Sequence, residues 1–190
     1  MIKDRQWSAK LEDIRSDHLN RYRFAASTIN GRVLDAACGC GYGASILHAE
    51  GMDVCGIDVS RETIDFAEKH YHGPGYTCGD ILDKPWLGRF DWIVCFETLE
   101  HLAQPLKALR LFREAGENLL ISVPNEALYP FDAAHFKDDD YPHLRHYTEF
   151  ELEDILGKAD WLTQAMFCQK DKQGEVVEGC DGKFLIFRCS

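Results

Sequence analysis

The sequence lacks the features that would indicate a membrane protein or a nucleic-acid-binding protein. Its longest apolar runs, residues 119–121 and 184–187, are far too short to span a bilayer. Its 21 Lys and Arg are outnumbered by 32 Asp and Glu, which gives a formal charge of −11 and no basic excess for binding phosphate backbones. We therefore expect no membrane span and no nucleic-acid partner. A small cationic or neutral ligand is compatible with this charge.

The eight cysteines lack a metal-binding pattern, because no Cys-x-x-Cys pair occurs among them. Residues 1–5 also lack the apolar core of a signal peptide. Because disulfides persist mainly in oxidising compartments, we expect reduced thiols and a cytoplasmic protein. Cysteines within apolar segments then act as small hydrophobic residues.

What is present is the composition of an ordinary globular protein. Of the 190 residues, 45% are apolar and 28% are charged, with no internal repeat and no low-complexity linker. This length favours one domain, which we expect to cover residues 1–190.

Helical and strand-like segments alternate along most of the chain. The spacing of apolar residues and the turn signals predict helices over 9–30, 42–50, 61–71, 105–115 and 149–158. Strands are predicted over 32–35, 53–58, 76–78, 90–96, 119–123, 161–170 and 183–189. This alternation predicts an α/β fold with a doubly wound, mostly parallel seven-stranded sheet, helices on both faces and a C-terminal antiparallel hairpin. Residues 126–147 form a long irregular loop, and loops of that length are usually functional.

A glycine-rich turn follows the first predicted strand. Gly39, Gly41 and Gly43 allow a sharp turn, a close approach of backbone N–H groups to a ligand, and close packing of the next helix. Asp58 ends the second strand, 19 positions after Gly39, where an acid can accept hydrogen bonds from both hydroxyls of a ribose. The order of strand, glycine turn, helix, strand and acid indicates a nucleoside-containing cofactor.

Two classes of cofactor compete for this turn. A dinucleotide places its pyrophosphate on the helix N-terminus, whereas S-adenosylmethionine has no phosphate and carries an ammonium and a sulfonium. Asp35, at the end of the first strand, suits the ammonium directly or through water and repels a pyrophosphate. Asp80, after the third strand, is placed to accept the adenine amino group. The acids therefore favour S-adenosylmethionine.

These segments resemble the class I S-adenosylmethionine-dependent methyltransferases. Residues 34–41 are similar to their first motif, 56–60 to the acid motif of the second strand, 79–80 to the adenine-side acid and 90–94 to the fourth strand. Residues 18–25 resemble the leading helix that closes over the cofactor in a small-molecule and glycan-linked branch (methyltransferase-11/23-like). One departure is Ala-Gly-Glu-Asn at 115–118, where the family often has Pro-Gly-Gly, and it affects placement within the family more than function.

The resemblance implies a Rossmann-like fold, S-adenosyl-L-methionine as the cofactor, and a leading cofactor-covering helix over residues 9–30. It also implies an acceptor-side loop over residues 126–147. The cofactor-binding residues that we predict are Asp35, Gly39, Gly41, Gly43, Asp58, Val59, Asp80, Ile81 and Phe96.

A polar segment follows the fourth strand, on the side where ligands bind in a doubly wound sheet. If residues 97–101 begin a helix, Glu97, Glu100 and His101 share one face. These side chains, with His143 or His146 from the long loop, are a ligand set for a divalent metal such as Mg²⁺. The segment resembles the metal-using ubiquinone-pathway O-methyltransferases and small-RNA 3′-terminal 2′-O-methyltransferases.

A second interpretation of the same segment involves no metal. In it Glu97 caps the loop, Glu100 faces solvent and His101 packs near the cofactor sulfur. The metal hypothesis takes Glu97, Glu100, His101 and His146 as the ligands.

Histidines also supply the candidate catalytic residues His101, His143 and His146. Imidazole titrates near neutrality and can act as a general base on a hydroxyl. The alternative is that these side chains only satisfy carbonyl groups of the loop.

The sequence thus predicts a methyltransferase acting on a small-molecule or glycan-type acceptor, at oxygen. One alternative is a metal-dependent RNA 3′-terminal 2′-O-methyltransferase, which the acidic charge and the lack of a Lys/Arg cluster near 126–150 disfavour. The other is a non-catalytic module that binds S-adenosylmethionine.

Overall fold

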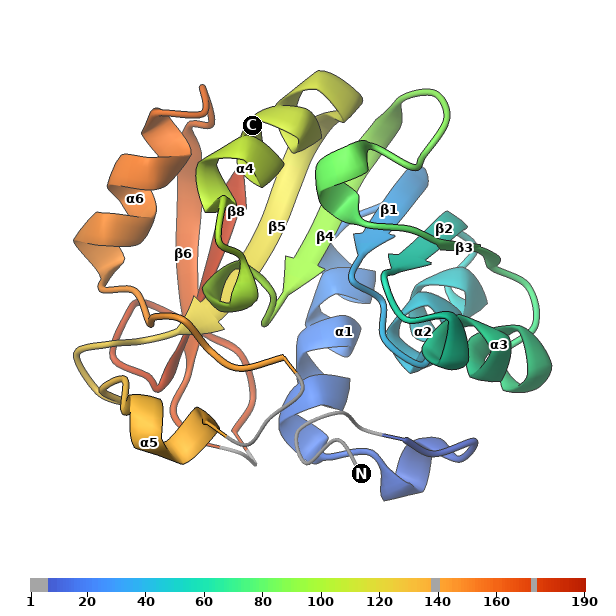
Figure 1. Ribbon diagram of the computed structural model, residues 1–190, viewed down its shortest axis with the longest axis horizontal. Coiled ribbons are helices and arrows are strands. Elements are labelled where there is room, and N and C mark those ends of the chain that lie inside the picture. Colours follow the sequence, from blue (N-terminus) through green and yellow to red (C-terminus); the bar gives the residue numbers. More distant parts are fainter. Residues whose placement is uncertain (1–6, 138–140, 172–173) are drawn as a thin grey trace.

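A computed structural model describes residues 7–137, 141–171 and 174–190 of the chain. In this part of the chain, eight strands form a single sheet in the order β3-β2-β1-β4-β5-β8-β6-β7 (Figure 1). The strands are β1 (Arg32–Ala36), β2 (Asp53–Asp58), β3 (Gly75–Cys78), β4 (Phe90–Phe96), β5 (Gly116–Pro124), β6 (Thr163–Gln169), β7 (Val177–Glu178) and β8 (Phe184–Cys189).

The pairing confirms the predicted doubly wound sheet and its C-terminal antiparallel hairpin. Strands β3, β2, β1, β4 and β5 are mutually parallel, whereas β8 runs antiparallel to both β5 and β6. The predicted number of seven strands is wrong by one among the described residues, because β7 pairs with the outer side of β6. This strand has two residues inside a polar connection, too few to show an alternating pattern.

Helices cover both faces of the sheet (Figure 1). One apolar cluster joins α1 and α2 to one face, and a second joins α4 and α6 to the other. Successive strand residues alternate between the two, so that Val33 belongs to the first cluster and Leu34 to the second. The helices are α1 (Ser16–Thr28), α2 (Tyr42–Ala49), α3 (Arg61–His70), α4 (Pro105–Ala115), α5 (Ala133–Phe136) and α6 (Glu149–Gly157), with 3₁₀ turns η1 (Leu11–Asp13), η2 (Ile81–Asp83) and η3 (Leu99–His101).

The leading helix is shorter than predicted. The apolar spacing predicts a helix from residue 9 to residue 30, but α1 begins at Ser16 after the separate turn η1. Arg15 has an extended backbone, and its guanidinium bonds to Asp17 through Nε (3.1 Å) and Nη2 (2.6 Å). Ile14 is buried in the same cluster as α1, so the apolar pattern continues beyond the helix that carries most of it.

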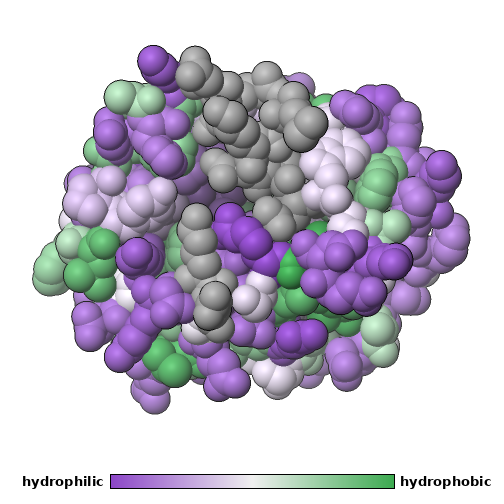
Figure 2. Space-filling view, turned by 90° about the horizontal axis from the view of Figure 1, so that it is seen from below, coloured by the Kyte–Doolittle hydropathy of each residue, from purple (hydrophilic) through white to green (hydrophobic). Residues whose placement is uncertain are grey.

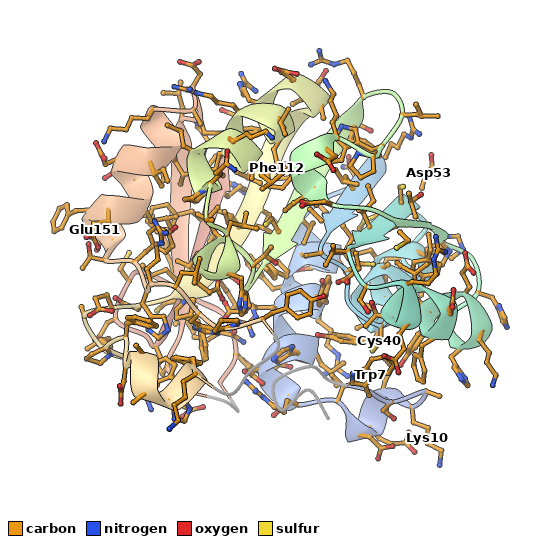
Figure 3. The ribbon with its side chains drawn as sticks, viewed as in Figure 1. Trp7, Lys10, Cys40, Asp53, Phe112 and Glu151 are labelled. Carbon is orange, nitrogen blue, oxygen red and sulfur yellow. The ribbon has the colours of Figure 1, made fainter. Side chains whose placement is uncertain are left out.

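The parallel strands place their carboxyl ends at one edge of the sheet, where ligands bind in this architecture. In the view of Figure 3, Asp53 at the start of β2 lies above Cys40 and Trp7, toward the other end of the strands. None of the helices in the described ranges is long and apolar enough to cross a membrane.

Candidate active site

A cavity of about 490 Å³ opens at the carboxyl ends of the parallel strands. The face that Figure 2 shows is mainly hydrophilic, with apolar residues visible between the charged ones. The cavity wall combines the glycine turn and strand ends with side chains from α1 and the loop 126–147. From the turn and strand ends come Gly39, Asp58, Val59, Asp80, Ile81 and Phe96, and from the other side come Arg21, Glu97, His101, Tyr129, Phe136, His143 and Phe184.

Asp58 anchors the glycine turn to the end of β2. Its side chain is 3% exposed. Its Oδ2 accepts a hydrogen bond from the Gly39 N–H (3.0 Å), and its Oδ1 accepts from the Ser60 N–H (2.9 Å) and the Thr63 hydroxyl (3.1 Å). These three donors hold the carboxylate at the cavity wall.

Glycine is needed at the three predicted positions for different physical reasons. Gly39 has φ +56°, and a Cβ added there would meet nothing within 4 Å, because this residue faces open space at the cavity. Gly43 has an ordinary φ, but its Cβ would lie 2.1 Å from the Tyr22 ring of α1. Gly41 has φ +90° and lies against Ala67 and Tyr76. Gly39 therefore leaves open space beside the cavity, whereas Gly41 and Gly43 are required by turn geometry and packing.

Asp35 lies one layer behind the cavity wall. It is fully buried, its Oδ1 accepts a hydrogen bond from the Tyr22 hydroxyl (2.9 Å), and its Oδ2 has no hydrogen-bond partner among the described residues. Burial raises the pKa of Asp35 to about 7, and the nearby Asp58 carboxylate adds to this rise. Asp35 is not among the residues that line the cavity, and the side chain of Tyr22 joins this predicted cofactor residue to the helix α1 that covers it.

The remaining predicted cofactor residues lie along one wall. Val59 is 49% exposed, Ile81 is nearly buried, and Asp80 caps η2 by accepting the Leu82 N–H (2.8 Å). Phe96 ends β4 and contacts the Tyr22 ring edge-on, with centroids 5.1 Å apart. This wall combines apolar surfaces with one exposed carboxylate, as a flat base with an exocyclic amino group requires.

Arg21 of α1 is a cavity residue that the sequence analysis missed. Its side chain is 1% exposed, and Nη1 lies 3.0 Å from Glu97 Oε1 while Nη2 lies 3.6 Å from Asp17 Oδ2. Neither nitrogen has a well-aligned hydrogen bond within the described chain. The signal in the sequence was a pair of opposite charges, Asp17 and Arg21, at i and i+4 among the apolar positions of the leading helix.

The segment after β4 does not form the helical turn considered for residues 97–101. Only Leu99–His101 forms a 3₁₀ turn, and Glu97 takes the left-handed conformation with φ +48°. Its carboxylate accepts from the Ser122 hydroxyl (2.8 Å) and pairs with Arg21. Glu97, Glu100 and His101 therefore do not share a helix face.

Glu100 is fully buried rather than facing solvent. Neither carboxylate oxygen has a hydrogen-bond partner in the described ranges, and burial together with the Glu97 charge raises the pKa of Glu100 well above its ordinary value. One ligand atom each from Glu100, His101 and His143 lies within 4.8 Å of the others. The structure thus brings together two of the predicted metal ligands with His143, while Glu97 and His146 lie outside this group.

The loop 126–147 supplies a cluster of imidazole and aromatic rings. Phe136 of α5 stacks on His143 with centroids 4.0 Å apart and an interplanar angle of 6°. His143 Nδ1 lies 2.8 Å from His146 Nε2, and His146 Nδ1 lies 2.6 Å from the Tyr129 carbonyl oxygen. Burial lowers the pKa of His143 to about 3, and the neighbouring imidazoles add to this effect. His143 and His101 line the cavity, whereas His146 is buried behind His143.

Comparison with known proteins places this geometry in a family. Residues 7–163 match the methyltransferase domain family. A ubiquinone biosynthesis O-methyltransferase of Chromobacterium violaceum is 31% identical over 107 residues, which are 53% of this chain and 45% of that protein. The protein of the same name from Coxiella burnetii is 38% identical over 90 residues, 44% of this chain and 38% of that protein.

The chain thus matches less than half the length of these curated relatives. A solved structure of an S-adenosylmethionine-dependent methyltransferase from Thermotoga maritima superposes with a TM-score of 0.76 at 18% identity, covering 93% of this chain and 89% of that one. This likeness shows a shared fold, and the domain match covers most of the chain. The chain belongs to the class I S-adenosylmethionine-dependent methyltransferases.

Proposed function

We propose that the protein transfers a methyl group from S-adenosyl-L-methionine to a hydroxyl oxygen of a small-molecule or glycan-type acceptor. The observation that carries this proposal is the single cavity that joins the glycine turn to the imidazole cluster. One end offers the loop and acids for the cofactor, and the other offers groups able to accept a proton. Proximity and alignment across such a cavity are the main requirements of methyl transfer.

The residues at the first end fit the cofactor. Asp58 suits the ribose hydroxyls, Gly39 the close approach of the chain, and the wall of Val59, Asp80 and Ile81 the adenine. Arg21 presents buried guanidinium nitrogens without well-aligned hydrogen bonds, which suit a carboxylate such as that of the methionine moiety. When bound, the cofactor supplies a methyl group on a sulfonium sulfur that keeps the carbon–sulfur electron pair as the acceptor oxygen forms its new bond.

The end of the cavity formed by the imidazole cluster offers a group that can take the proton of the acceptor hydroxyl. His143 lines the cavity in a neutral form, because burial holds its pKa far below neutrality. A neutral ring nitrogen accepts a hydrogen bond from the acceptor hydroxyl and takes its proton as the oxygen–carbon bond forms, although a pKa this low makes the imidazole a weaker base than an ordinary histidine. His101 lies against His143 edge-on, with centroids 4.6 Å apart, and helps to enclose the same space. We assign His143 as the base, His101 as its cavity neighbour and His146 as a residue behind them.

The names of the relatives support oxygen as the acceptor atom. The relatives described above are named as O-methyltransferases of a small molecule. Their names give no support to methylation of RNA or to a non-catalytic role, and the formal charge of −11 disfavours RNA.

A divalent metal ion is a second proposal for the same end of the cavity. It is favoured by the convergence of Glu100, His101 and His143, because two carboxylate oxygens without donors in the described chain suit a cation. Two imidazoles with one carboxylate suit a transition-metal ion better than Mg²⁺. Such an ion would lower the pKa of an acceptor hydroxyl and make the imidazole base less important. Activity that is lost in chelator and restored by Mn²⁺ or Zn²⁺ would support the metal; activity unchanged by chelator would exclude it.

The experiment that tests the main proposal is transfer of labelled methyl from S-adenosylmethionine into phenolic, sugar and RNA acceptors, with and without chelator. Calorimetry of cofactor binding accompanies it. We expect micromolar binding and label in the small-molecule fraction. The absence of both binding and transfer would refute the proposal, and label in RNA alone would replace its acceptor class.

A further inference from the structure

The ring nitrogens of His143 and His146 form a chain that ends on a backbone carbonyl. The Tyr129 carbonyl oxygen can only accept a hydrogen bond, so His146 Nδ1, 2.6 Å away, must carry a hydrogen. In a neutral His146 the other nitrogen, Nε2, then carries a lone pair. His143 Nδ1, 2.8 Å from it, must in turn donate. The chain of bonds therefore leaves the hydrogen of a neutral His143 on Nδ1 and the lone pair on Nε2.

We propose that His146 is a positioning residue that fixes the tautomer of His143, so that the His143 Nε2 lone pair faces the acceptor. The catalytic role in this inference rests on the proposed function, whereas the hydrogen-bond chain does not. His143 lines the cavity while His146 does not, so Nε2 is the nitrogen that can reach an acceptor. The Tyr129 carbonyl sets the direction of every hydrogen in the chain, as a carboxylate does for the imidazole of a catalytic triad.

The surroundings hold this chain rigidly. Phe136 covers one face of the His143 ring at 4.0 Å, and the edges of Phe131 and Phe136 contact His146 at 5.5 and 5.7 Å. His146 is 5% exposed. Glu126 Oε2 lies 4.0 Å from His146 Nδ1 and accepts the Phe131 N–H (2.8 Å), which closes the turn that presents the Tyr129 carbonyl. The rings can therefore neither turn over nor exchange partners without unpacking the loop.

The fixed tautomer selects the chemistry of the acceptor. A lone pair accepts a hydrogen bond from an O–H group and repels a group that has only lone pairs, such as a carboxylate. The inferred tautomer thus favours methylation of hydroxyls and disfavours esterification of carboxylates. The same substrate bearing a carboxyl in place of its hydroxyl would leave two lone-pair atoms facing each other, which costs affinity.

Nitrogen-15 NMR of the histidine rings, on the free protein in chelator at pH 7.5, tests the inference directly. Protonated and unprotonated ring nitrogens have distinct chemical shifts, so the tautomer of each ring can be read. We expect His143 to show a protonated Nδ1 and an unprotonated Nε2. A protonated Nε2 on His143 in the wild-type protein would overturn the inference without any variant being made.

His146→Phe removes both hydrogen bonds and keeps a ring of similar size. We expect the hydrogen of His143 to move to Nε2, the form that free imidazole side chains prefer. His135→Phe is the matched control, because His135 lines the same cavity and contacts Phe136 edge-on at 4.8 Å without bonding to His143. An unchanged His143 tautomer in folded His146→Phe, or an equal change in His135→Phe, would refute the inference.

Turnover then separates this inference from the proposed function. With a hydroxyl acceptor that the labelling experiment identifies, His146→Phe should lower kcat at least about tenfold and leave the Kd for S-adenosylmethionine unchanged, because a wrong tautomer offers no lone pair. A tautomer as inferred with no methyl transfer to any acceptor refutes the proposed function alone. A shifted tautomer with unchanged kcat refutes the role of His146.

Discussion

The two ends of the cavity are built in different ways. At the cofactor end, polar contacts join residues close to strand ends, and Asp58 holds Gly39, Ser60 and Thr63 through direct hydrogen bonds. At the acceptor end, rings from the loop 126–147 stack on and surround the imidazoles of His143 and His146. The first end is a preformed part of the sheet, whereas the second depends on how one loop packs.

Burial also shifts the pKa values at the two ends of the cavity in opposite directions. It raises the pKa of Asp35 to about 7 behind the cofactor wall and lowers the pKa of His143 to about 3 at the acceptor wall. Both shifts favour the neutral form. The comparison teaches that burial favours the uncharged side chain at both ends, although the sign of the pKa shift differs between an acid and a base.

The largest effect is expected from Asp58→Ala, which should weaken binding of S-adenosylmethionine at the cofactor end. It removes the carboxylate that we propose accepts both ribose hydroxyls, and hydrogen bonds to a charged group are worth about 1.5–3 kcal/mol each. We expect the affinity for S-adenosylmethionine to fall on the order of a thousandfold, measured by calorimetry. Asp80→Ala is the control, because Asp80 is exposed and accepts one bond; it should cost about tenfold or less. Equal losses in the two variants would contradict the role of Asp58.

The next effect breaks the acceptor end. His143→Phe keeps the stack with Phe136 and removes the base, so kcat should fall about a hundredfold, at the low end for general base catalysis. The Kd for S-adenosylmethionine should stay within about twofold, since the ring lies outside the cofactor wall. Kinetics under saturating cofactor and calorimetry measure the two quantities. A loss of cofactor affinity as large as the loss of kcat would show that the two ends are not separable.

The sequence predicts the cofactor end of the cavity better than the acceptor end. The parallel sheet, the glycine turn and the acid of each strand end were predictable, because each is written into a few neighbouring residues with a period or a turn signal. Arg21 was missed, and His143 could not be separated from His146, because their surroundings come from residues far away in the chain. The position of Glu97 was also missed. Its left-handed backbone and its partners Arg21 and Ser122 come from tertiary packing, not from local spacing.

A third prediction tests how closely α1 packs against the glycine turn at the cofactor end. Gly43→Ala places a Cβ 2.1 Å from the Tyr22 ring, so either the ring or the helix must move. Overpacking of this kind costs about 2–3 kcal/mol of unfolding free energy, measured by urea denaturation, and should weaken cofactor binding as well. Gly39→Ala, with open space around its Cβ, should cost only the strain of its φ of +56°, about 1 kcal/mol. In a Tyr22→Ala background the penalty of Gly43→Ala should shrink, and an unchanged penalty would mean that this contact is not its cause.

The smallest effect concerns pH, and it contrasts the two ends directly. Because the pKa of Asp35 is raised from 3.8 to about 7, the folded protein keeps this proton over a range where the unfolded chain has lost it. The stability that Asp35 contributes is therefore complete below pH 4 and lost as the pH rises through 7. Asp35→Asn keeps an acceptor for the Tyr22 hydroxyl and cannot ionise. It should raise the unfolding free energy at pH 8, where the buried wild-type carboxylate is mostly charged, and leave it nearly unchanged at pH 4.

His143 should give the opposite dependence, because its folded pKa lies near 3, below the ordinary value of 6.5. Its contribution is complete above pH 6.5 and is lost as the pH falls toward 3. Urea denaturation of Asp35→Asn, His143→Phe and the wild-type protein from pH 4 to pH 8 compares the two slopes. Asp35→Asn should gain stability relative to wild type at the alkaline end, and His143→Phe should do so at the acidic end. If both variants shift stability in the same direction across this range, the two ends of the cavity are not tuned separately by burial.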